Sequence, residues 1–125
     1  MDNDKNNGEK IRRSVLGDEH VEQSNQNISD FNAPFVEFIT QGAWGTVWAG
    51  DAWTKRERSI VTIALLAAQG HDDELEMHIR AAANTGATRD DIREAFMHVA
   101  VYAGVPSANR AFRIAMKVFD TQVKS

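Results

Sequence analysis

The longest apolar run of the chain, residues 60–68, is bracketed by a helix start and a helix stop. Thr54 and Glu57 have the spacing of a capping box, in which both side chains satisfy backbone N–H groups at the first turn. Gly70 follows the run and tolerates the left-handed backbone that ends a helix. The run has nine residues, far fewer than the roughly 20 that a membrane-spanning helix needs. The run therefore predicts a buried helix at residues 54–69.

The same kinds of signal recur along the chain, and no alternating pattern indicates strands. Glycines mark the stops, Ser29 or Asp30 is a candidate cap, and Pro106 sits where the first turn of a last helix accepts it. We predict an all-α fold, a single-domain helical bundle. The expected helices cover residues 10–16, about 30–48, 54–69, 72–84, 88–103 and 105–120.

Composition limits the domain count and the partners. A chain of 125 residues is the size of one domain, so we expect a tail at residues 1–9 and one domain at residues 10–125. Lys and Arg total 14 against 18 Asp and Glu, and the basic residues form no block. This balance argues against nucleic acid or a membrane as a partner. Cysteine is absent, which excludes disulfides, thiolate metal sites and thiol nucleophiles.

The first ten residues are polar, include acidic side chains and lack an apolar segment. This composition is not that of a secretory signal. It predicts a disordered tail at residues 1–9 of a cytoplasmic protein.

Two expected helices are apolar over nearly their whole circumference, at residues 60–68 and 92–103. A helix that is apolar all round needs burial on all sides. A chain of this size cannot cover both, so we expect a homo-oligomer.

Three polar residues follow Gly70 at helical spacing. His71, Glu74 and His78 lie on one stripe beside Leu75, at the edge of an apolar seam. A histidine in that position is partly shielded from water, so its proton affinity is readily tuned for proton transfer near neutral pH. The same three side chains are alternatively ligands for zinc or a similar ion.

A second polar stripe occurs on the helix that starts at Thr88. Glu94, His98 and Tyr102 are spaced by four residues and stack along one side. A carboxylate one turn from an imidazole can fix its tautomer, and a tyrosine hydroxyl adds a neutral donor. Such a stripe also occurs on ordinary solvated helix faces.

Six blocks, in order, resemble the carboxymuconolactone decarboxylase family of the alkylhydroperoxidase D-like superfamily. The resemblance extends from about Ile11 to Phe119 and implies an all-helical fold of that type, a homohexameric ring, and no metal or organic cofactor. It also implies decarboxylation of 4-carboxymuconolactone to 3-oxoadipate enol-lactone in the protocatechuate branch of the β-ketoadipate pathway. The blocks are residues 12–17, 30–32, 43–48, 58–66, 78–82 and 98–106.

Peroxidases of the same superfamily carry a Cys-x-x-Cys-x-x-x-His signature with a glycine eight residues after the histidine. His78 and Gly86 have that interval, and His71 and Glu74 then occupy the two cysteine positions. Without thiols a disulfide relay cannot operate. The resemblance therefore implies a peroxidase-like scaffold with proton-transfer groups in the site.

The implied reaction expels CO₂ by pushing two electrons through the ring double bond into the lactone carbonyl. It needs a donor near the lactone oxygen, an anchor for the distal carboxylate and an acid for the ring α-carbon. We expect His78 to protonate the carbon or donate to the oxyanion, with His98, oriented by Glu94, as the second candidate. The expected substrate-binding residues are Arg58, His71 and Tyr102, with the Arg58 guanidinium as carboxylate anchor.

Alternatives to these roles remain open. For His71, which follows a helix stop, the alternative is a solvated loop residue with no role in the site. For Arg58, the alternative is an ion pair with Glu94 or with a carboxylate of another subunit. A thiol-independent or metal-binding relative acting on a related substrate is the alternative function.

Overall fold

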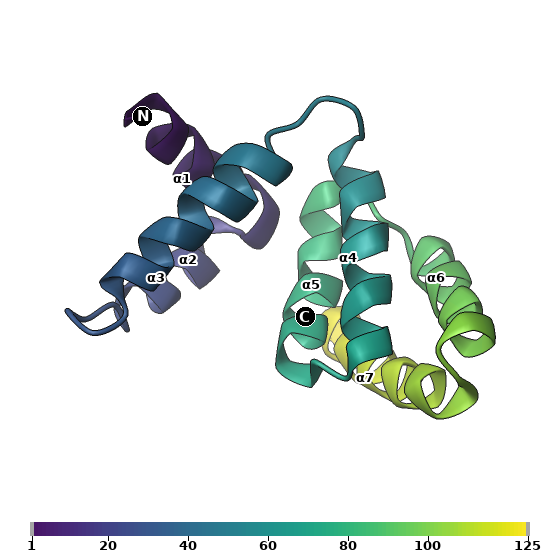
Figure 1. Ribbon diagram of the computed structural model, residues 1–125. Coiled ribbons are helices and arrows are strands. Elements are labelled where there is room, and N and C mark those ends of the chain that lie inside the picture. Colours follow the sequence, from purple (N-terminus) through teal and green to yellow (C-terminus); the bar gives the residue numbers. More distant parts are fainter. Residues whose placement is uncertain (1, 125) are drawn as a thin grey trace. The chain divides into compact units, whose positions relative to one another are not determined.

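Every regular element within residues 2–124, the part that this computed structural model describes, is a helix, as predicted (Figure 1). Side chains are described for residues 7–122. No helix in the described chain is long and apolar enough to span a membrane. The elements are α1 (Asp2–Leu16), α2 (Asp18–Asn25), α3 (Ala33–Ile39), the π-helix η1 (Thr40–Val47), α4 (Lys55–Gln69), α5 (Asp72–Thr85), α6 (Arg89–Tyr102) and α7 (Val105–Lys124).

The chain divides into two compact units of internal contacts, and the single domain expected over residues 10–125 stays a prediction. The first unit ends at Lys55 and the second begins at Arg56. The division falls at the start of α4, just after the non-helical segment at residues 48–54. A break there has a physical reason, because the buried apolar residues that form the core cluster all belong to the second unit.

The first unit is held by a close approach between α1 and η1. A Cβ added to Gly8 of α1 would overlap the backbone carbonyl oxygen of Thr40. Val15 and Val21 are fully buried, and the rings of Trp44 and Trp48 lie 5.1 Å apart. Because α1 begins at Asp2, most of the segment predicted as a tail at residues 1–9 falls within this helix.

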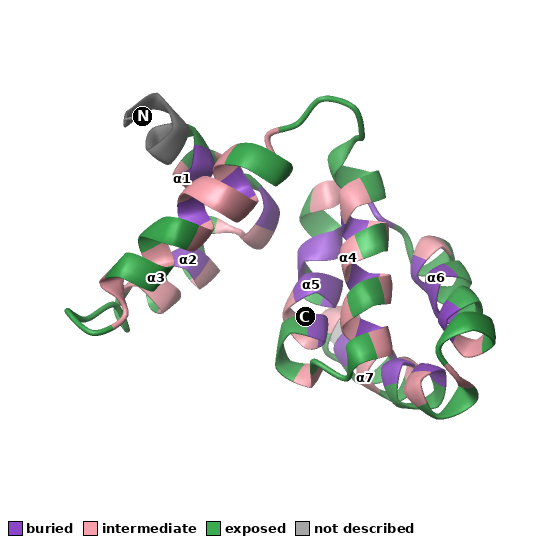
Figure 2. Cartoon of the chain, in the orientation of Figure 1, coloured by how far each residue is buried: buried purple, intermediate pink, exposed green. Residues whose placement is uncertain are grey.

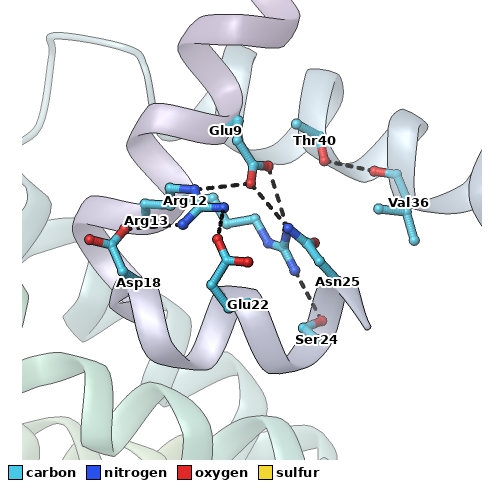
Figure 3. A network of polar contacts seen from close by, with 9 residues as sticks. All are labelled: Glu9, Arg12, Arg13, Asp18, Glu22, Ser24, Asn25, Val36 and Thr40. Carbon is cyan, nitrogen blue, oxygen red and sulfur yellow. Dashed lines mark hydrogen bonds and ion pairs between the residues drawn. The ribbon is translucent and has the colours of Figure 1, made fainter. Parts of the chain in front are cut away.

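A polar network joins α1 to α2 in the same unit (Figure 3). The Arg12 side chain is nearly buried and donates hydrogen bonds to Asn25 Oδ1 at 3.1 Å and Ser24 Oγ at 3.0 Å. Glu9 forms ion pairs with both Arg12 and Arg13, at 3.5 and 3.2 Å. The nearly buried Arg12 guanidinium therefore has polar partners on both α1 and α2.

The second unit is built around an apolar cluster. Figure 1 shows α4 between α5 and α6, with α7 crossing below them. Figure 2 shows buried residues on each of these four helices. Phe96 is fully buried and packs edge-on against Phe112, with ring centroids 5.2 Å apart. The cluster consists of Ile63, Ala67, Leu75, Ile79, Ala82, Ala87, Ile92, Phe96, Val99, Ala108, Ala111, Ala115 and Val118.

Helix ends in the second unit agree with the predicted signals. Gly86 ends α5 in a left-handed conformation with φ of 90°, which only glycine adopts without strain. Thr88 and Asp91 form a capping box at the start of α6, where the Thr88 Oγ1 atom accepts from the Asp91 N–H at 3.1 Å. Helix punctuation in this half of the chain is thus encoded locally.

Two features of the first unit differ from the prediction. Gly17, with φ of 92°, is followed directly by α2, which the sequence analysis did not propose. The single helix expected at about residues 30–48 is instead α3 followed by the π-helix η1. Apolar periodicity does not separate these helix types, since both keep a continuous hydrogen-bonded coil.

Candidate active site

A hollow of about 400 Å³ lies between α4 and α6 in the second unit. Its α4 wall is apolar, whereas α6 contributes two carboxylates and an imidazole beside one small apolar residue. In the apolar wall Ile60 and Ala64 also pack against the core cluster, whereas Val61 and Leu65 are exposed. The lining residues are Ile60, Val61, Ala64, Leu65, Asp91, Glu94, Ala95 and His98.

Two of the three predicted catalytic residues, Glu94 and His98, line this hollow together. They lie one turn apart on α6, as their spacing predicts. Both are exposed, and no hydrogen bond joins them among the described contacts. The His98 ring instead stacks on the predicted substrate-binding residue Tyr102, with centroids 5.1 Å apart and planes inclined by 23°. An aromatic ring on one face therefore holds the imidazole at the edge of the hollow.

His78 lies apart from this hollow. It is on α5 and only 7% exposed, among the buried residues of that helix. Its Nδ1 atom is buried without a hydrogen bond, although the residue makes another interaction. The structure therefore places the two candidate proton donors in different environments, one buried and one facing an open hollow.

The other predicted residues also lie apart from the hollow lining. His71 is exposed just before α5, with its Nε2 atom 3.3 Å from Gln69 Oε1. Arg58 is half-buried in the first turn of α4 and makes at least one interaction. No group of three His, Asp or Glu side chains within the described residues could hold a metal ion. The alternative zinc site at His71, Glu74 and His78 therefore has no support from this geometry.

Arg56, in the first turn of α4, was not predicted from the sequence as a site residue, and it pairs with a residue that lines the hollow. Its Nε and Nη2 atoms donate to Asp91 Oδ2 and Oδ1 at 2.8 and 2.6 Å. The Asp91 pKa is lowered from 3.8 to about 2, first by this side-chain hydrogen bonding and second by the Thr88 backbone N–H. The same pairing raises the Arg56 pKa. The residues are 35 positions apart, so no local spacing could have revealed the pair.

A second hollow of about 440 Å³ lies in the first unit, between α1, α2 and α3. Glu9, Arg12 and Asn25 of the polar network line it, and none of the six predicted site residues does. The hollow between α4 and α6 is therefore the better candidate for an active site. An imidazole, a carboxylate and an apolar wall suit proton transfer to a partly apolar substrate.

Comparison with known proteins identifies the family of the chain. The chain is 46% identical over 112 residues to a 4-carboxymuconolactone decarboxylase of Acinetobacter baylyi, covering 90% of this chain and 84% of the relative. It is 41% identical over 116 residues to a nitrosuccinic acid decarboxylase of Metarhizium robertsii, covering 93% and 81%. A 4-carboxymuconolactone decarboxylase of Pseudomonas putida matches 38 residues at 47% identity, 30% of this chain and 79% of the relative. The model of the carboxymuconolactone decarboxylase family matches residues 33–117, and the chain belongs to that family.

Proposed function

We propose that the protein decarboxylates 4-carboxymuconolactone to 3-oxoadipate enol-lactone, a step of aromatic compound catabolism in the protocatechuate branch of the β-ketoadipate pathway. The observation that carries the proposal is the 46% identity to the Acinetobacter baylyi enzyme over most of both chains. The hollow between α4 and α6 adds physical support, because it combines an imidazole and a carboxylate with an apolar wall.

In this proposal the γ-carboxylate leaves as CO₂, and its electron pair moves through the ring double bond into the lactone carbonyl. The conjugated lactone is its own electron sink, so the proposal needs neither a metal nor a coenzyme. His98, held against Tyr102, then protonates the ring α-carbon, and Glu94 supports the charged imidazole from one turn away. His78 is the alternative donor, and Arg58 and His71 are the proposed binding residues outside the hollow lining.

The test is to follow the ultraviolet absorbance of 4-carboxymuconolactone with purified protein, before and after treatment with a chelator. We expect turnover in both cases. Protein that leaves the compound unchanged, or that acts only after an ion or coenzyme is added, would overturn the proposal.

The Metarhizium robertsii relative favours a second candidate substrate, nitrosuccinic acid. In that compound the nitro group takes the electron pair as CO₂ leaves, so the chemical demands on the protein are similar. Comparing kcat/KM for the two compounds separates the candidates. We expect the lactone to have the larger value, and a larger value for nitrosuccinic acid would reassign the substrate.

We also propose a homo-oligomer, with a hexamer as the expected state, in the cytoplasm. Large apolar side chains exposed on a single chain support assembly. Light scattering should give a mass of six times 13.9 kDa, and a monomer would contradict the assembly. The exposed side chains include Phe31, Phe35, Phe38, Leu65, Met97, Val101 and Tyr102.

A further inference from the structure

Arg56 reaches the hollow described above through its partner Asp91. Asp91 lines the hollow, and His98 lines it seven residues later on the same helix. Seven residues correspond to a rise of about 10 Å along a helix. Asp91, which holds the Arg56 guanidinium, and the His98 imidazole therefore lie at two ends of one hollow, with Ile60 and Ala64 along its wall.

The geometry of the pair leaves part of the guanidinium available. An arginine has five N–H donors, arranged as a side-on fork of Nε and Nη2 and an end-on fork of Nη1 and Nη2. Asp91 takes the side-on fork through both of its oxygens. The described contacts of Arg56 leave both Nη1 donors and one Nη2 donor unused. The Arg56 side chain is 50% exposed, against 14% for Asp91, so a ligand can reach the end-on fork.

Both candidate substrates share one chemical feature beside the carboxyl group that leaves. In 4-carboxymuconolactone and in nitrosuccinic acid, the reacting carbon also carries a –CH₂–COO⁻ arm. A carboxylate matches the end-on fork of a guanidinium in a bidentate pair. The lining of the hollow contains no lysine or arginine to receive such an arm, and Arg56 is paired with the lining residue Asp91.

We propose that Arg56 binds the carboxymethyl carboxylate of the substrate through its end-on fork, and that Asp91 is a positioning residue that orients it. This inference rests on the proposed function and specifies its substrate class: acids whose reacting carbon bears a carboxymethyl arm. It assigns the carboxylate anchor to Arg56, where the sequence analysis expected Arg58.

The experiment measures kcat and KM of Arg56→Gln for 4-carboxymuconolactone. We expect KM to rise by about tenfold or more, because a charge-assisted bidentate pair is lost, with a smaller change in kcat. Arg56→Lys should recover part of the loss. In Asp91→Asn the guanidinium keeps its charge and loses its orientation, so we expect a smaller rise in KM. A merely structural role of Asp91 would lower the melting temperature and leave KM unchanged.

Arg93→Gln is the matched control, because Arg93 pairs with Asp90 at 2.7 Å on the surface of α6, the helix that carries Asp91. Its KM should equal that of the wild type. If Arg56→Gln behaves like Arg93→Gln, the inference is wrong even though the proposed function stands.

A binding measurement distinguishes a failure of the Arg56 inference from a failure of the proposed function. Succinate carries the same carboxymethyl group and does not react, so its titration can be followed by NMR in wild type and Arg56→Gln. We expect succinate to shift the Arg56 Nε–H signal and hollow resonances in the wild type, and we expect the hollow shifts to disappear in the variant. Equal shifts in both proteins would overturn the inference whether or not the lactone is turned over.

Discussion

The two units of the chain are stabilised in different ways. In residues 56–124, thirteen buried apolar residues form one cluster, twelve of them on four helices and Ala87 in the connection between α5 and α6. In the first unit a nearly buried arginine is satisfied by polar partners on two helices, and a glycine allows α1 to approach η1 (Figure 3). The candidate site lies entirely in the apolar unit, on α4 and α6. The comparison suggests that a rigid apolar core positions the reacting groups, since sites on packed helices are held more precisely than sites on loops.

The largest expected effect is in the apolar unit. Phe96→Ala removes a fully buried ring that contacts Phe112, and we expect it to lower the free energy of unfolding by about 3–5 kcal/mol. Hydrogen exchange should show lost protection in α4 to α7, with α1 and η1 little changed. Arg93→Ala is the control, because Arg93 is on the same helix and its side chain is 58% exposed. Equal loss of protection in both units would mean that they unfold as one domain.

The next effect concerns the first unit. In Gly8→Ala the new methyl group meets the Thr40 carbonyl oxygen, so α1 must move away from η1. We expect a cost of about 1–3 kcal/mol in the free energy of unfolding, measured by denaturant titration. Gly42→Ala is the control, because a Cβ there meets nothing within 4 Å. An unchanged stability in Gly8→Ala would instead favour the disordered tail predicted for residues 1–9.

The smallest effect is acid sensitivity at the junction of α4 and α6. The Asp91 pKa is about 2 in the folded protein and 3.8 ordinarily, so the folded state favours the ionised carboxylate. This contribution is fully present above about pH 4 and is lost as the pH falls toward 2. The melting temperature should therefore fall less for Asp91→Asn than for wild type between these pH values. Asp90→Asn should follow the wild type, and parallel curves for Asp91→Asn would contradict the pKa assignment.

Much of the second unit could be predicted from sequence because its signals are local. The glycine stop at Gly86 and the cap at Thr88 each act within one helical turn, and the bounds of α4, α5 and α6 agree with the prediction within two residues. The first unit was predicted less well. Arg12 finds its partners at Ser24 and Asn25 through tertiary contacts, and such a network has no period in the sequence.

In the candidate site, too, local spacing could be predicted from the sequence and contacts between helices could not. Helical spacing predicted that Glu94, His98 and Tyr102 share one side of a helix, and the structure places them so. The Arg56–Asp91 pair joins two helices and could not be found from spacing. Spacing also made His78 prominent without showing that its side chain is buried.

The most direct test of the central claim, that the reaction takes place in the hollow between α4 and α6, compares His98→Ala with His78→Ala. Both variants are assayed with 4-carboxymuconolactone after circular dichroism has shown that they are folded. We predict that His98→Ala loses at least about a hundredfold in kcat, the usual effect of removing an acid–base group, and that folded His78→Ala loses much less. Full activity in His98→Ala together with a hundredfold loss in His78→Ala would contradict the account and place the chemistry at His78.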